Sequence, residues 1–164
     1  MKRLSLCLVV FAVMLTFTAP VVAQKYEGTP IKSGQATFMY NGKDLTYKFV
    51  EGGFQQMQSF TIATMVFKLH QKTSKVTDNH LNITVMYKEP GKVDLDSTFS
   101  MSGISMFSSG DVSRFTKGKS KCTITITKAN TTEVEGTADC TLMHNISDKV
   151  MPPVKSMKFS AKIK

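Results

Sequence analysis

The chain has 164 residues, of which 41% are hydrophobic and 20% charged, and its formal net charge at pH 7 is +9. This length fits one domain with a hydrophobic core, and the lack of an internal repeat or linker argues against a second domain. The basic balance favours anionic partners, such as a polyanionic glycan, lipid headgroups, nucleic acid or an acidic protein, although the same charge also serves solubility alone.

The first residues have the three parts of a secretory signal peptide. Met1-Lys2-Arg3 is a short basic start, residues 4–22 are almost unbroken apolar sequence, and small residues end the run at Ala23. We therefore expect a signal peptide over residues 1–23 and a single mature all-β domain over residues 24–164.

Two details of this segment argue against an anchor. Pro20 interrupts the apolar run and no positively charged stop-transfer flank follows, which disfavours a membrane span. Cys7 lies inside the run, whereas a lipid-anchored protein needs its cysteine at the cleavage point. We expect a periplasmic or secreted protein with no transmembrane segment after cleavage.

The mature chain begins with a predicted hairpin around Asn41-Gly42. Apolar residues take alternate positions on both sides of this pair, at Ala36, Phe38 and Tyr40 and then at Leu45, Tyr47 and Phe49. Such alternation is typical of strands with one buried face, and an Asn-Gly pair favours a tight turn because both residues readily adopt positive φ.

The middle of the chain holds one clear strand pair and two ambiguous segments. Alternating apolar residues over 81–87 and 93–99 flank a Glu89-Pro90-Gly91 turn. Residues 60–69 are apolar at both parities, which fits a helix or a strand buried on both faces, and their β-branched content favours the strand. Residues 101–118 contain several Gly and Ser, and we expect a mobile loop or a short edge strand there.

The clearest pattern predicts a hairpin closed by a disulfide. Even positions are apolar over 122–126 and again over 134–142, with a polar stretch between them. A hairpin centred on Thr131 places Cys122 opposite Cys140 on the buried face. Opposed Cβ atoms in an antiparallel pair lie about 4.5–5.5 Å apart, close to the separation of about 3.5–4.5 Å that a disulfide needs. The hydrophobic pattern and the cysteine pair independently indicate this register.

The last segment alternates once more, with Met157, Phe159, Ala161 and Ile163 apolar and serines and lysines between them. Eight or nine short strands in total predict an all-β fold: an antiparallel sandwich or barrel with one disulfide in its C-terminal hairpin.

The order of these strands carries a family resemblance. An early N-G hairpin and a central P-G turn precede C-T-I-T-I-T-K…V-E-G-T-A-D-C and a last strand V-K-S-M-K-F-S-A-K-I. In this order the chain resembles the small exported β-domain proteins of unknown function common in Bacteroidota, whose terminal hairpin often reads I-T-I-T-K…V-x-G-T-F. The likeness covers the last third well and the rest in outline, and this chain lacks the lipid-anchoring Cys that many of them carry. The resemblance implies the fold class and export, and no activity.

Motifs for catalysis and for metal binding are weak. Lys117-Gly118-Lys119-Ser120 ends like a P-loop but lacks the first Gly of that motif, and no serine sits in G-x-S-x-G. Asp94 and Asp96 fit a solvated strand face better than an acid–base pair, and the three histidines share no ligand spacing. We expect no enzyme activity, catalytic residue, metal site or cofactor.

Two basic runs are the best candidates for a binding surface. The candidate residues are Arg114, Lys117, Lys119, Lys121, Lys158, Lys162 and Lys164. If their strands are neighbours, one basic face results, which suits a polyanion; alternatively, the lysines protect edge strands from aggregation. No aromatic residues interleave with them, which argues against nucleic acid.

Two functions stand as hypotheses. The first is a non-enzymatic binding domain of the cell envelope that recognises an anionic surface, such as an envelope glycan, a lipid or an acidic protein. The alternative is a lipocalin-like carrier of a small apolar ligand inside a closed barrel, with Ile104, Met106 and Phe107 flanking its mouth. A filled interior would argue against the carrier.

Overall fold

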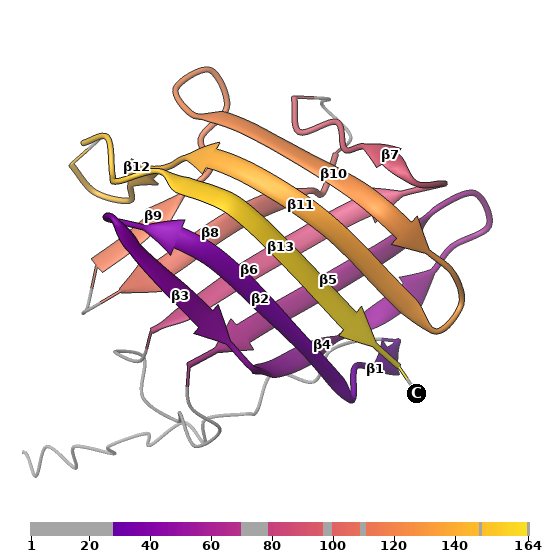
Figure 1. Cartoon of the computed structure of the whole chain (residues 1–164). Coiled ribbons are helices and arrows are strands. Elements are labelled where there is room, and N and C mark those ends of the chain that lie inside the picture. Colours follow the sequence, from indigo (N-terminus) through magenta and orange to yellow (C-terminus); the bar gives the residue numbers. More distant parts are fainter. Residues whose placement is uncertain (1–27, 70–78, 97–99, 109–110, 148, 164) are drawn as a thin grey trace, which may run out of the picture.

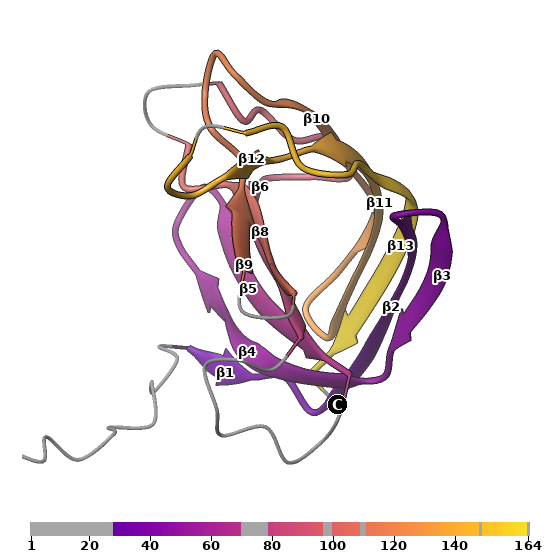
Figure 2. The ribbon, with the colours of Figure 1, turned by 90° about the vertical axis from the view of Figure 1, so that its left-hand side faces the viewer.

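The computed structural model describes residues 28–69, 79–96, 100–108, 111–147 and 149–163. The expected signal peptide and Lys164 lie outside these residues. In the described part of the chain every regular element is a β-strand, and the strands form two antiparallel sheets that face each other (Figures 1 and 2). This confirms the all-β class and gives a sandwich.

The seven-stranded sheet has the order β1-β4-β5-β6-β8-β9-β12. Its strands are β1 (Thr29–Pro30), β4 (Phe49–Gln56), β5 (Thr61–Lys68), β6 (His80–Tyr87), β8 (Gly103–Ser108), β9 (Asp111–Arg114) and β12 (Met143–His144). The ambiguous residues 60–69 contain β5, which lies between β4 and β6, so the strand prediction is confirmed. Side chains of both parities are buried there, including Ile62 and Met65, which explains the lack of alternation.

The six-stranded sheet has the order β3-β2-β13-β11-β10-β7. Its strands are β3 (Lys43–Tyr47), β2 (Ser33–Tyr40), β13 (Val154–Lys162), β11 (Glu133–Thr141), β10 (Lys121–Ala129) and β7 (Gly91–Lys92). The predicted turn between β2 and β3 is present, with φ of 51° at Asn41 and 73° at Gly42. The last strand lies inside this sheet, between β2 and β11.

The predicted register of the C-terminal hairpin is confirmed. Cys122 pairs with Cys140 and Ile126 with Gly136, and a disulfide joins the two cysteines, whose Cα atoms are 4.0 Å apart. A bulge after Ile126 then shifts the pairing by one residue, so that Ala129 faces Val134. As a result, the centre of the hairpin lies between Thr131 and Thr132 and not at Thr131 as expected.

Two expectations about the middle of the chain, and the expected number of strands, differ from the structure. Residues 101–118 hold two strands, β8 and β9, and β8 pairs on both sides, so it is not an edge strand. Residues 93–96 of the strand expected over 93–99 are not in a strand, and residues 97–99 lie outside the described residues; the short strand β7 precedes them, and the backbone NH of Val93 donates to the carbonyl of Ile124, at 2.8 Å. The described residues form thirteen strands, three of them with only two residues, instead of eight or nine.

The space between the sheets is filled by side chains. Inward-facing residues of both sheets form one continuous core, in which Phe67, Met106 and Ile126 are almost completely buried. Ile104 and Met106 belong to this core through β8, so they do not flank a barrel mouth as expected. Among the described residues, no helix has the length and apolar character needed to cross a bilayer.

Candidate functional site

A pocket of about 510 Å³ lies at one end of the sandwich. One wall consists of β1 and the adjoining ends of β4, β5 and β6, and the turn that follows β6 forms the rim. The other wall is the turn between β10 and β11, with Ile163 beyond the end of β13. These parts gather at the end of the molecule where the C-terminus is marked (Figure 1). We call this end the pocket end.

A row of three side chains crosses the first wall. Gln56 of β4 pairs with Thr61 of β5, and Thr61 pairs with Tyr87 of β6. Directly paired residues of an antiparallel sheet point to the same face, and Tyr87 continues the inward parity of Val85. The row therefore faces the space between the sheets, as the last inward row before solvent.

Tyr87 is the most unusual member of this row. The residue is 9% exposed, and its hydroxyl oxygen is buried without a hydrogen-bond partner among the described residues. Burial raises the pKa of Tyr87 to about 12, because the phenolate would lose its hydration there. Buried polar groups in folded proteins are almost always paired, so an unpaired hydroxyl beside a pocket marks a place where a ligand can supply the partner.

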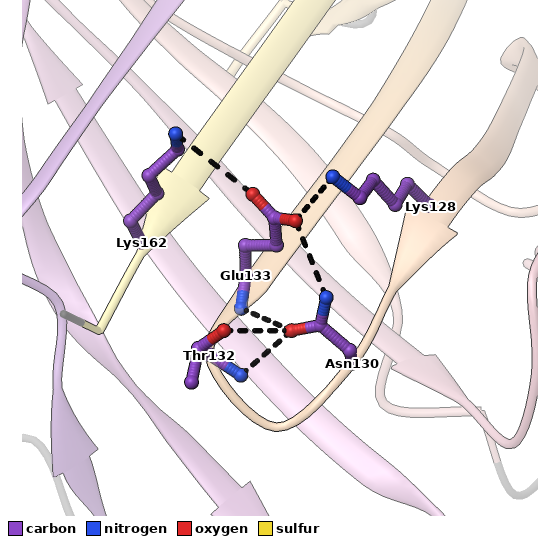
Figure 3. A network of polar contacts seen from close by, with 5 residues as sticks. All are labelled: Lys128, Asn130, Thr132, Glu133 and Lys162. Atoms are coloured by element: carbon purple, nitrogen blue, oxygen red, sulfur yellow. Dashed lines mark hydrogen bonds and ion pairs between the residues drawn. The ribbon is translucent and has the colours of Figure 1, made fainter.

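The opposite wall is held by a polar network around Glu133 (Figure 3). The Glu133 carboxylate pairs with Lys128, lies 3.9 Å from Nζ of Lys162, and accepts a hydrogen bond of 3.2 Å from Nδ2 of Asn130. Oδ1 of Asn130 accepts from the backbone NH groups of Thr132 and Glu133, at 2.8 and 3.0 Å, and from the Thr132 hydroxyl. The network fixes the turn and uses the polar groups of the Asn130 side chain.

This network also shifts two pKa values. The hydrogen bond from Lys128 is the main cause that lowers the pKa of Glu133, and the same contact raises the pKa of Lys128. Each charged form is stabilised by the other. The acidic residue nearest to this wall is thus already compensated within the protein.

Four of the sequence-predicted basic residues lie at the other end of the sandwich. Arg114 ends β9 opposite Met143, and Lys121 begins β10 opposite Thr141, whereas the pocket meets the far end of β10. Lys117 and Lys119 are exposed in the connection between β9 and β10, and Lys117 donates to the backbone carbonyl of Asp96. We call this end the basic end.

The remaining predicted basic residues are not joined to these four in one face. Lys158 and Lys162 lie on the outer side of β13, but β11 stands between β13 and β10. β11 contributes acidic side chains to the same outer side, at Glu133, Glu135 and Asp139. The outer face of this sheet therefore alternates in charge, and Lys164 lies outside the described residues.

In the described part of the chain, no three His, Cys, Asp or Glu side chains could hold a metal ion. His144 lies between two polar side chains, with its Nδ1 2.9 Å from Oγ of Ser147 and its Nε2 3.8 Å from Oδ1 of the exposed Asp111. Asp94 and Asp96 are exposed, and Oδ1 of Asp94 accepts from the backbone NH of Asp96, at 2.9 Å, within a local turn. Nδ1 of His144 accepts from the backbone NH of Ser147, at 3.1 Å, and so stabilises the turn after β12.

Sequence reasoning missed the row of Gln56, Thr61 and Tyr87. One signal for it exists: Tyr87 continues the inward alternation of its strand and comes just before the Glu89-Pro90-Gly91 turn, which places it at a strand end. Its unpaired hydroxyl depends on the facing turn of the other sheet, which is distant in the sequence.

Comparisons with protein-family models, with curated proteins and with solved structures found no match to this chain.

Proposed function

We propose that this protein is an exported, non-enzymatic binding domain whose end pocket holds one small molecule. The observation that carries the proposal is the pocket of about 510 Å³ beside the buried, unpaired hydroxyl of Tyr87. This volume lies within the range of about 300–1,000 Å³ that is typical of small-molecule sites. An unpaired buried hydroxyl costs stability in the free protein, and such a cost is expected where binding repays it.

Two further features support the proposal. The disulfide between Cys122 and Cys140 is of the kind that persists in oxidising compartments outside the cytosol, which supports export. The titratable side chains lining the pocket are Tyr87, Lys88 and Glu89, a set that offers no nucleophile paired with a base and so favours binding over catalysis. The filled core leaves no space for a ligand between the sheets, which favours the end pocket over the interior of a barrel.

The test is a titration of the isotope-labelled protein with a small-molecule extract of its native host, followed by NMR. We expect amide shifts to concentrate at residues 54–56, 61, 87–89 and 129–131, which line the pocket. Absent shifts, or shifts centred on the outer faces of the sheets, would contradict the proposal.

A second candidate function is recognition of an anionic surface at the basic end. The observation that favours it is a groove of about 270 Å³ lined by Lys121, Lys155 and one acidic residue, Asp139, at the same end of the sandwich as the exposed Arg114. Replacing Arg114, Lys117, Lys119 and Lys121 with Ser should release the protein early from a heparin column, whereas replacing Lys158 and Lys162 should have less effect because acidic side chains lie beside them. Unchanged retention of the first variant would argue against this function.

A further inference from the structure

The lining of the end pocket is rich in neutral hydrogen-bonding groups. One amide and four hydroxyls contribute, from Gln56, Thr29, Thr61, Thr131 and Tyr87. Amides and hydroxyls both donate and accept hydrogen bonds, so together they complement a ligand that does the same. None of these five side chains has a hydrogen bond to another residue in the described part of the chain.

Pro90 is exposed and Ala129 is half-buried, but the larger apolar side chains of the pocket offer little surface to a ligand. Phe54, Tyr87 and Ile163 line it, but their exposed fractions are only 6, 9 and 7% because the core covers the rest of each side chain. Hydrophobic binding energy scales with the apolar area that a ligand removes from water. A long alkyl chain would therefore find neither an open apolar wall nor a channel into the filled core.

Net charge is also missing from the pocket. Lys88 and Glu89 are the only lining residues of formal charge, they have opposite signs, and both are exposed at the rim. The nearby carboxylate of Glu133 is compensated by Lys128 and Lys162. An ionic ligand would lose its hydration without gaining an opposite charge at the inner wall.

We infer that the end pocket recognises an uncharged, hydroxyl-rich ligand with the chemistry of one or two sugar rings, bound by Gln56, Thr61 and Tyr87. The inference rests on the proposed function and names the ligand class of that site. The hydroxyl oxygen of Tyr87 is closed to solvent in the free protein, so binding includes a turn of the phenol toward the pocket. In that position the Tyr87 hydroxyl, which is unpaired in the free protein, forms a hydrogen bond with a ligand oxygen.

The test divides one extract of the native host into a neutral aqueous fraction, an ion-exchange-retained fraction and an organic-soluble fraction. Each fraction is titrated into the labelled protein, and the neutral fraction is also used after periodate treatment, which cleaves vicinal diols. We expect the neutral fraction to shift the amides of Gln56, Thr61 and Tyr87, and periodate to lower its apparent affinity at least about tenfold.

Variants separate the hydrogen bonds from the fold. Tyr87→Phe and Gln56→Ala should each weaken binding of the neutral fraction about tenfold, a loss typical of a buried hydrogen bond in a ligand site. Gln35→Ala is the matched control, because Gln35 lies on the outer side of β2. Tyr87→Phe should keep or raise the melting temperature, so a loss of binding by this variant cannot come from unfolding.

The outcomes are distinct. Pocket shifts caused by the organic or the ionic fraction, or a neutral fraction unaffected by periodate, would overturn the ligand class and leave the proposed function standing. If no fraction shifts the pocket residues, the proposed function fails and the ligand class fails with it.

Discussion

The two ends of the sandwich differ in whether their charged side chains are paired. At the pocket end, the Glu133 carboxylate is surrounded by Lys128, Asn130 and Lys162, and the lining groups other than the oppositely charged Lys88 and Glu89 are neutral. At the basic end, Arg114 and Lys121 are exposed, and no carboxylate of a described residue forms an ion pair with either. At the pocket end, where the charges are compensated, recognition depends on hydrogen bonds. At the basic end, the uncompensated charges are themselves available for recognition.

The ends also differ in what holds them together. The basic end has a covalent link, since the disulfide joins Cys122 near the start of β10 to Cys140 near the end of β11. The pocket end depends on the non-covalent network of the turn between the same two strands. One hairpin thus stabilises both ends by different means, which allows each to be perturbed alone.

Removing the disulfide should have the largest effect on stability. The bridge closes a loop with a sequence separation of 18, and cross-links of that length stabilise by about 3 kcal/mol through the unfolded state. We expect the Cys122→Ala, Cys140→Ala double variant to lose about this much free energy of unfolding in urea, while the Gln56 and Tyr87 amides keep their chemical shifts. A loss below about 1 kcal/mol, or shifts that spread to the pocket end, would contradict the separation of the two ends.

Replacing Tyr87 with Phe should stabilise the ligand-free protein, in contrast to the loss of the disulfide. Because the hydroxyl is buried without a partner, its removal should raise the free energy of unfolding of the ligand-free protein by about 1 kcal/mol. Tyr40→Phe, at the far end of β2, is the control, with an expected change within about 0.5 kcal/mol. Destabilisation by Tyr87→Phe would show that the hydroxyl has a partner in the free protein.

The raised pKa of Tyr87 predicts that the protein loses stability at alkaline pH. Burial raises the pKa of Tyr87 from 10.0 to about 12, so the unfolded chain releases this proton first. The contribution of Tyr87 to stability is complete below pH 10 and is lost as the pH rises toward 12. Urea unfolding at pH 9 and pH 11 should show a smaller drop for Tyr87→Phe than for the wild type; an equal drop would contradict the assignment.

Neutralising Glu133 should have a smaller, pH-dependent effect, because its ion pairs are near solvent. The folded state holds the pKa of Glu133 below 4.5, so the stability that it contributes is present above pH 4.5 and is lost as the pH falls through the lowered value. Glu133→Gln should therefore reduce stability at pH 7 and flatten the acid limb of the stability profile. Asp44→Asn, on the exposed part of β3, is the control, and equal profiles for the two variants would argue against the network.

The sequence carried some of this architecture and not the rest, for physical reasons. Period-two alternation and the cysteine pair define the register from Cys122 to Ile126, because both depend on local geometry. The bulge after Ile126 left no such signal, and β8 left only a short one, the alternation of Ile104 and Met106. Gly103 and Ser105 are polar or small in a segment that becomes an internal strand only because β6 and β9 flank it. Strand order is a long-range property, so the interruption of the basic face by β11 could not be predicted.

The candidate site was harder to predict from the sequence than the fold. The inward parity that leads to Tyr87 was visible, but the pocket arises where that strand end meets a turn some forty residues later in the chain. The charged residues that form a recognisable run in the sequence, such as Arg114 and Lys121, lie at the other end. Neutral amides and hydroxyls, such as those of Gln56 and Thr61, are common on exposed strands and have no distinctive spacing.

The most direct test of the central claim is a native mass spectrum of the wild-type protein and of Tyr87→Phe, each purified gently from the native host. We predict a reproducible extra mass on the wild type that denaturation removes, and a clearly lower occupancy on Tyr87→Phe. A wild-type protein that carries no extra mass, or equal occupancy in the two proteins, would contradict a ligand held at the Tyr87 end of the sandwich.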